Sequence, residues 1–182
     1  MLLPDLQSRL RIALTNTLVN EWSLFSPTAG TSRPSQRSIA FHLGWNLRPL
    51  VERSWDIDTE YERSGMALES TERLADHRSP DLVVHRRGKL GPEHNLLLVE
   101  LSADGSPEGE EYGLQLQRRF GYRYAVALSL RLHDATTQWT VAPTWRWSVL
   151  EQGPVTEGPQ DVYLPEVLGE ITQRGSRRGT AR

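Results

Sequence analysis

The sequence predicts a single domain of mixed α/β class. Apolar residues recur with the period of amphipathic helices in three segments, and runs typical of β-strands occupy the stretches between and after them. The chain has 182 residues, of which 37% are hydrophobic, which is the usual size of one domain and long enough to bury a core. After an additional N-terminal helix, the predicted order is helix, three strands, helix, strand, with one further strand behind.

Two helices are expected in the N-terminal part of the chain. Residues 2–22 carry leucines at helical spacing. A loop of small residues and prolines at 26–34 interrupts the pattern, and Ser35 can cap a second helix that runs to about Glu52. The expected buried stripe of this second helix consists of Ile39, Leu43, Leu47 and Leu50.

At Trp55 the repeat of apolar residues changes from about 3.6 residues to two residues, which predicts a strand. Its alternate positions are acidic and predict a solvated sheet face formed by Asp56, Asp58, Glu60 and Glu62. Residues 64–78 are polar and predict a loop or a short helix. The apolar runs 81–85 and 96–101 are typical of buried strands, and the turn-rich stretch between them favours a hairpin.

A third helix is expected to begin near Ser106 and Pro107, because proline and acids are favoured in a first turn, and to end at Gly121. Strands follow at 122–132 and 138–150. Pro143 has no amide hydrogen to donate, so the last strand should lie at an edge or carry a bulge. Three tryptophans share one face of this strand, either as core or as an aromatic contact surface: Trp139, Trp145 and Trp147.

The domain is expected to span residues 1–172, because residues 173–182 form a basic sequence typical of a flexible tail. With 21 basic and 23 acidic residues the net charge is −2, so any binding to nucleic acid must be local. We find neither a secretory signal nor an apolar run long enough to span a membrane, which predicts a cytoplasmic protein without a membrane partner.

The absence of cysteine excludes disulfides, thiolate metal sites and a cysteine nucleophile. Any metal must therefore be held by carboxylates, histidines or backbone oxygens. His42 and His85 lie on apolar elements and are expected to be core or rim histidines, and no histidine pair has the spacing of a zinc site.

Two acids stand at corresponding ends of the predicted hairpin. Pro80 and Asp81 open its first strand, and Glu100 and Ser102 end its second. Two carboxylates that converge from neighbouring strands repel unless a hard divalent cation lies between them. The pattern therefore predicts a Mg²⁺ or Mn²⁺ site at Asp81 and Glu100, with Glu60 as the further acid most expected to approach it.

This pattern resembles the PD-(D/E)xK superfamily of restriction-endonuclease-like nucleases, in which Pro-Asp opens one strand and acid-x-Lys ends its hairpin partner. Residues 36–43 resemble the family's leading helix, residues 58–63 its first strand, and residues 122–128 the strand after its second core helix. The resemblance covers about residues 35–132. It implies an αβββαβ core around a mixed sheet, with an extra N-terminal helix and an extra C-terminal strand.

The chain departs from the family's pattern at two positions. Ser102 stands where the family has its lysine, and Gln36 stands where the leading helix commonly supplies an acid. Loss of one group that stabilises a transition state costs about 10²–10³ in rate, so the resemblance implies a catalytically impaired protein. Gln115 or Arg118 of the following helix would be the substitute for the missing lysine. Lys89, in the hairpin turn, is a poorer candidate for this role.

The expected function is therefore binding, either to nucleic acid, with DNA favoured over RNA, or to a protein partner. The resemblance implies a nucleic-acid-processing or defence-type assembly. One alternative is an active nuclease that hydrolyses phosphodiesters with Mg²⁺ held by Asp81 and Glu100. Another is a structural subunit that uses the tryptophan-bearing strand as its contact. Homo- and hetero-oligomers are open under each alternative.

Overall fold

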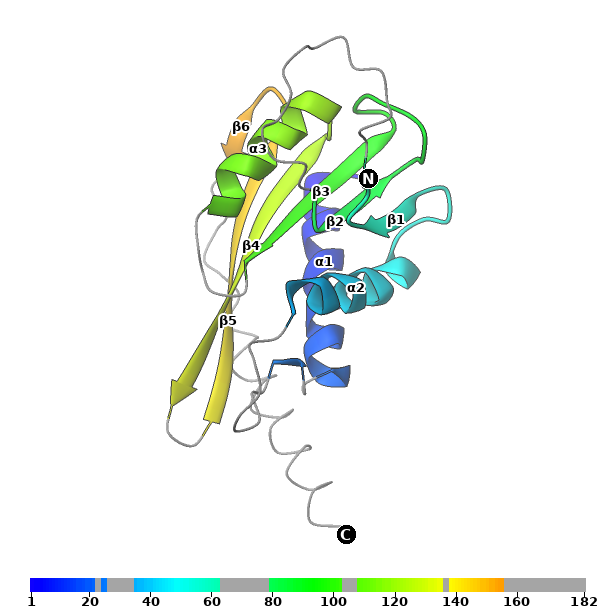
Figure 1. Ribbon diagram of the computed structural model, residues 1–182. Helices are drawn as coiled ribbons and strands as arrows, with labels where there is room; N and C mark the ends of the chain where they lie inside the picture. Colours follow the sequence, from blue (N-terminus) through cyan, green and yellow to red (C-terminus); the bar gives the residue numbers. More distant parts are fainter. Residues whose placement is uncertain (22–23, 26–34, 63–78, 103–107, 136–137, 156–182) are drawn as a thin grey trace.

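The computed structural model describes residues 1–21, 24–25, 35–62, 79–102, 108–135 and 138–155. The predicted polar segment 64–78 and the predicted tail 173–182 lie outside them. Figure 1 shows the elements in chain order: α1 (Leu3–Asn20), α2 (Gln36–Leu47), the 3-10 helix η2 (Arg48–Leu50), β1 (Asp56–Thr59), β2 (Leu82–His85), β3 (Asn95–Ser102), α3 (Glu108–Phe120), β4 (Tyr124–Ala135), β5 (Gln138–Val149) and β6 (Gly153–Val155).

The strands form one mixed sheet whose spatial order is the chain order, β1 to β6. β1, β2 and β3 are antiparallel neighbours. β4 runs parallel to β3, so the connection between them needs a crossover, which α3 supplies. β5 and β6 continue the sheet in antiparallel fashion. The mixed α/β class and the order helix, three strands, helix, strand are thus confirmed.

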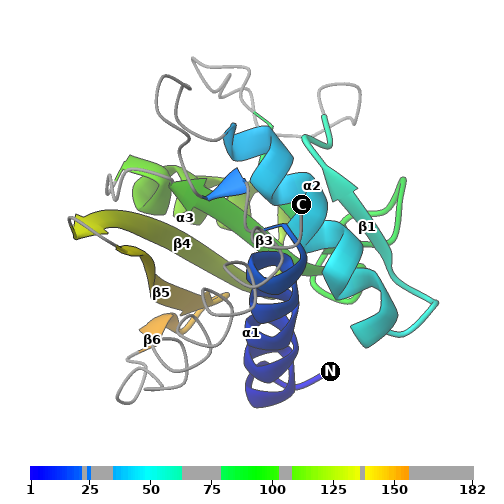
Figure 2. The same ribbon diagram turned by 90° about the horizontal axis from the view of Figure 1, so that it is seen from below.

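Helices cover both faces of the sheet (Figures 1 and 2). α1 and α2 pack on one face, where leucines of both helices join Val84, Leu97 and Val99 in the larger core. α3 lies on the other face, where Leu116 packs with a smaller cluster that includes Val83 and Leu98. Because β2 and β3 are buried from both sides, their sequences are apolar almost without interruption.

The first two helices follow the predicted periodicity. Leu6, Leu10, Leu14 and Leu18 of α1 are buried, as are Ile39, Leu43 and Leu47 of α2. α2 ends at Leu47, five residues before the predicted end, because Pro49 has no amide hydrogen to continue the helical hydrogen bonds and the chain continues as η2. None of the described helices is long and apolar enough to cross a membrane.

The β4–β5 hairpin extends beyond the rest of the sheet (Figure 1). Pro143 lies opposite Leu130 on a stretch of β5 that β6 does not reach, because β6 pairs only with residues 147–149. This placement agrees with the predicted edge position of the proline. Trp145 and Trp147 are buried in the larger core, so these two form core and not a contact surface. The side chain of Trp139 lies outside the described residues.

Candidate carboxylate site

Asp81 and Glu100 lie at the same end of the β2–β3 hairpin. Leu82 pairs with Val99, and the two acids lie one residue before and one residue after that pair. The ladder ends at this pair, and the two carboxylates contact different elements. That of Asp81 bonds Gln36 of α2 and the amide of Leu101, whereas the side chain of Glu100 lies under α3.

Asp81 is held by donors from two other elements. Its Oδ2 atom accepts a hydrogen bond from the backbone amide of Leu101 at 2.7 Å and one from Nε2 of Gln36 at 2.9 Å. The same Nε2 atom donates to the carbonyl oxygen of Leu101 at 2.5 Å. Since Gln36 is the first residue of α2, these bonds join α2, β2 and β3 at one point.

Glu100 lies beneath α3 and is only 2% exposed. Gly109 and Gly113, one helical turn apart, form the part of α3 above it. A Cβ atom on Gly113 would lie 3.0 Å from Cγ of Glu100, and one on Gly109 would lie 3.6 Å from its Cβ. The absence of side chains at these two positions lets the helix approach the sheet closely enough to bury the carboxylate.

Ser102 follows Glu100 by two residues on β3, so both side chains lie on the α3 face of the sheet. Gln115 and Arg118 do not replace the family's lysine there. They follow Gly113 by two and five residues, about 200° and 140° around the helix, and both are exposed. The structure therefore places them on the outer face of α3, away from Glu100.

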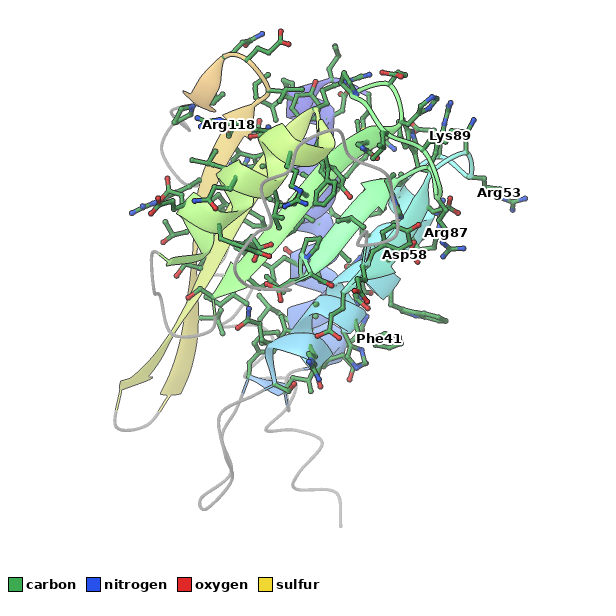
Figure 3. All side chains as sticks on the ribbon, turned by 45° about the horizontal axis from the view of Figure 1, so that its top comes forward. Phe41, Arg53, Asp58, Arg87, Lys89 and Arg118 are labelled. Carbon is green, nitrogen blue, oxygen red and sulfur yellow. The ribbon has the colours of Figure 1, made fainter. Side chains whose placement is uncertain are left out.

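Lys89 lies in the β2–β3 turn, at the end of β3 opposite to Ser102 (Figure 3). Glu60 lies beside Asp81, because its backbone amide donates to the carbonyl oxygens of Pro80 and Asp81 at 3.1 and 3.3 Å. It follows β1 with a left-handed φ of 51°, and its carboxylate forms an ion pair with Arg37 of α2. Within the described ranges, no three His, Asp or Glu side chains are grouped so that they could hold a metal ion.

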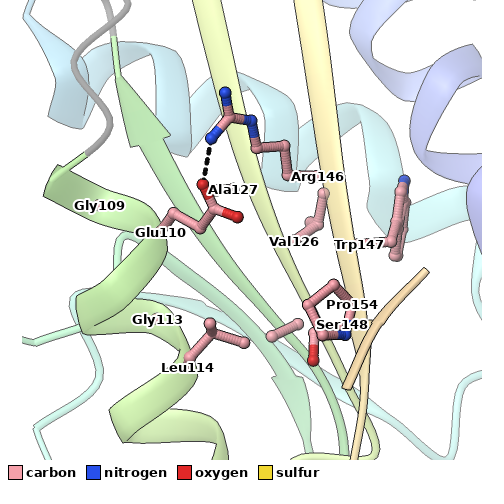
Figure 4. Close-up of a pocket in the computed structure, with 11 residues that line it drawn as sticks. Gly109, Glu110, Gly113, Leu114, Val126, Ala127, Arg146, Trp147, Ser148 and Pro154 are labelled. Carbon is pink, nitrogen blue, oxygen red and sulfur yellow. Dashed lines mark hydrogen bonds and ion pairs between the residues drawn. The ribbon is translucent and has the colours of Figure 1, made fainter. Parts of the chain in front are cut away.

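A small hollow with a volume of about 10 Å³ lies between α3 and strands β4, β5 and β6 (Figure 4). Gly109 and Gly113 contribute to its wall, and Arg146 forms an ion pair with Glu110 at its side. Glu100 pairs with Ala127, which pairs with Arg146. Arg146 therefore lies two strands away from Glu100, in the same row of paired residues and on the same face of the sheet. The spacing of residues in the sequence does not reveal this relationship.

A second polar cluster lies at the other end of β2, where His85 is fully buried. Its Nε2 atom lies 2.8 Å from Oδ2 of Asp58, and Tyr61 packs edge-on against its ring. Arg87 donates to both oxygens of Asp58, at 2.8 and 2.5 Å, and Figure 3 shows these two side chains together. The hydrogen bonds from Arg87 lower the pKa of Asp58.

This cluster confirms His85 as a core histidine and corrects the prediction for Asp58. The acidic strand is not a fully solvated face, because Asp58 is held between a buried imidazole and a guanidinium. His42 lies at the rim, where it pairs with Glu21 at 3.4 Å. Both histidines therefore have structural partners.

No protein-family model, curated protein or solved structure matches this chain. The site is thus defined by its own geometry: two acids at the same end of a hairpin, Asp81 bonded to Gln36 and Glu100 covered by α3.

Proposed function

We propose that this chain is a divergent PD-(D/E)xK-fold protein that acts by binding and does not hydrolyse phosphodiesters. The order α2, β1, β2, β3, α3, β4 and the parallel pairing of β3 with β4 support the fold assignment. The positions of Asp81 directly before β2 and of Glu100 near the end of β3 support it further, because these are the ends at which the resembling family carries its acids.

The observation that carries the proposal is the neutral side chain on the Glu100 face of β3. Ser102 occupies the position of the family's lysine, and the two substitutes from α3, Gln115 and Arg118, are exposed on that helix's outer face. A lysine there would stabilise the charge that develops on the phosphate. Its loss costs about 10²–10³ in rate, which leaves binding as the function that the geometry supports best.

One observation favours a second candidate, a Mg²⁺-dependent nuclease. Magnesium binds through one or two carboxylates together with water and phosphate oxygens, so Asp81 and Glu100 are a suitable pair to hold it. The metal would polarise the phosphate and lower the pKa of the attacking water. By strand register, Arg146 is a cation in the row of Glu100 that could contact a phosphate.

The outer face of α2 supplies a surface suited to binding. Phe41 and Trp45 are 54% and 71% exposed, and their rings stack with centroids 6.3 Å apart. The exposed Arg37 lies one turn before Phe41 and contacts Glu60. Exposed aromatic rings beside a cation are typical of surfaces that stack the bases of a single strand or anchor a protein partner.

Gel shifts with single- and double-stranded DNA and RNA in excess Mg²⁺ test this proposal. We expect shifted, intact nucleic acid with an affinity that falls steeply with salt, and weaker binding after Phe41→Ala with Trp45→Ala. Ile12→Ala is the matched control, because Ile12 is an exposed apolar residue of α1. No shift from folded protein would direct the search to a protein partner, and cleavage that requires Asp81 and Glu100 would contradict the proposal.

A further inference from the structure

We infer that the side-chain amide of Gln36 takes the place of a metal ion between Asp81 and the carbonyl group of Leu101. The inference deepens the proposed function and rests on its assignment of the carboxylate site. It predicts that the site takes up no metal, in addition to lacking the lysine.

Two oxygen atoms converge on one nitrogen at this point. Nε2 of Gln36 lies 2.9 Å from Oδ2 of Asp81 and 2.5 Å from the carbonyl oxygen of Leu101. Carboxylate and backbone carbonyl oxygens are the ligands that hard divalent cations use. Both are acceptors, so the NH₂ end of the amide and not its oxygen must face them, and its two hydrogens can serve one acceptor each.

The strand geometry explains why an electropositive group is needed there. β2 begins at Leu82, so the ladder between β2 and β3 ends before Leu101, which pairs with Leu128 of β4 but has no partner in β2. The amide of Leu101 donates to Asp81, which leaves its carbonyl beside a carboxylate. Two neighbouring electronegative groups require a donor or a cation, and Gln36 supplies the donor.

The position of Gln36 in α2 strengthens this effect. As the first residue of the helix, it lies where unpaired backbone amides create the positive end of the helix dipole. The amide and the helix terminus together offer partial positive charge to Asp81 without a full charge or a bound ion. Glutamate at the same position would place a second carboxylate beside Asp81 and would require a cation.

A metal ion must therefore displace Gln36 before it can contact Asp81 and Leu101. Two hydrogen bonds are lost in that exchange, and we expect wild type to bind a divalent cation about tenfold to a hundredfold more weakly than a variant without the amide. Gln36→Ala removes the amide and adds no charge. Gln36→Glu adds the carboxylate that completes a metal-binding set.

The test is Mn²⁺ binding measured by titration calorimetry and by the Mn²⁺ electron paramagnetic resonance signal. It compares wild type, Gln36→Ala, Gln36→Glu and each of these two variants combined with Asp81→Asn. Gln115→Glu is the matched control, because Gln115 is exposed on the outer face of α3. The melting temperature of each protein is measured with and without Mn²⁺, so that a destabilised but folded Gln36→Glu protein is recognised by its rescue.

We expect no uptake by wild type or by Gln115→Glu at millimolar Mn²⁺, and uptake by both Gln36 variants that disappears when Asp81 is replaced. Among the proteins compared, Gln36→Glu should show the largest rise in melting temperature on addition of Mn²⁺. Wild type that binds Mn²⁺ through Asp81 as tightly as Gln36→Ala would overturn the inference, as would folded Gln36 variants that bind none. None of these readouts involves cleavage, so the proposed function stands or falls separately on the gel-shift and cleavage results.

Discussion

The carboxylate of Asp81 lies 2.9 Å from the side-chain nitrogen of Gln36, and this bond joins the start of α2 to the start of β2. The backbone amide of Leu101 donates to the same carboxylate oxygen. A group that could have bound a metal thus serves as a structural acceptor, and the stability of the fold should depend on it.

Replacement of Asp81 by Asn should lower the free energy of unfolding by about 1–3 kcal/mol, because hydrogen bonds to a charged group are stronger than those to a neutral one. Urea denaturation measures the change. Asp5→Asn, an exposed acid in the first turn of α1, is the control and should cost less than about 1 kcal/mol. Equal effects of both substitutions would show that Asp81 is not a structural acceptor.

Gly113→Ala should destabilise the protein by about 1–3 kcal/mol, because overpacking at a closed contact forces its neighbours to move. The added Cβ would meet Cγ of Glu100 at 3.0 Å and Cδ2 of Leu98 at 3.6 Å. Gly109→Ala is the matched control, since its nearest contact would be an ordinary 3.6 Å and alanine favours the helix. Thermal unfolding of the two variants should shift in opposite directions. A stabilised Gly113→Ala protein would mean that α3 does not close over Glu100.

The Asp58 cluster predicts a pH dependence of stability. Because Arg87 lowers the pKa of Asp58 from its ordinary 3.8, the folded state favours the charged carboxyl. The resulting stabilisation is present above the unfolded pKa and is lost as the pH falls through the lower folded value. Wild type should therefore lose stability on acidification below about pH 4, and Asp58→Asn should lose less over the same range. Parallel curves of unfolding free energy against pH for the two proteins would contradict this.

The two groups of aromatic residues should respond differently to truncation. Trp45→Ala should change the free energy of unfolding by less than about 0.5 kcal/mol, because the ring is mostly exposed. Trp147→Ala should cost about 3–5 kcal/mol, because that ring is buried in the larger core. Urea denaturation compares them directly. A large loss for Trp45→Ala would show that α2 uses the ring for packing and not as an exposed contact surface.

Most elements could be predicted from the sequence because each carries a strong local signal. The leucine stripe of α1, the apolar runs of β2 and β3, and the glycine after α3 all coincide with the structure. Gly121 ends α3 with a φ of 67°, as a helix C-terminus favours. β6 was missed because its three residues, Gly153, Pro154 and Val155, have the composition of a turn and form a strand only by pairing with β5.

The candidate site could be predicted only in part. Asp81, Glu100 and Gln36 were recognisable from a motif, but the contact between Gln36 and Asp81 depends on how α2 docks at the end of the hairpin. The row from Glu100 through Ala127 to Arg146 depends on register across β4, which local periodicity does not contain. Glu60 was expected near the site and its backbone amide does bond the carbonyl oxygen of Asp81, but the ion pair of its carboxylate with Arg37 could not be read from the strand pattern.

The central claim is that the carboxylate site no longer hydrolyses phosphodiesters because it lacks a lysine and is filled by Gln36. The most direct measurement is plasmid cleavage in excess Mg²⁺ by wild type and by the double variant Ser102→Lys with Gln36→Glu, each with and without Asp81→Asn. We predict no cleavage by wild type and cleavage by the double variant that disappears with Asp81→Asn. Cleavage by wild type that requires Asp81 and matches the rate of the double variant would contradict the claim.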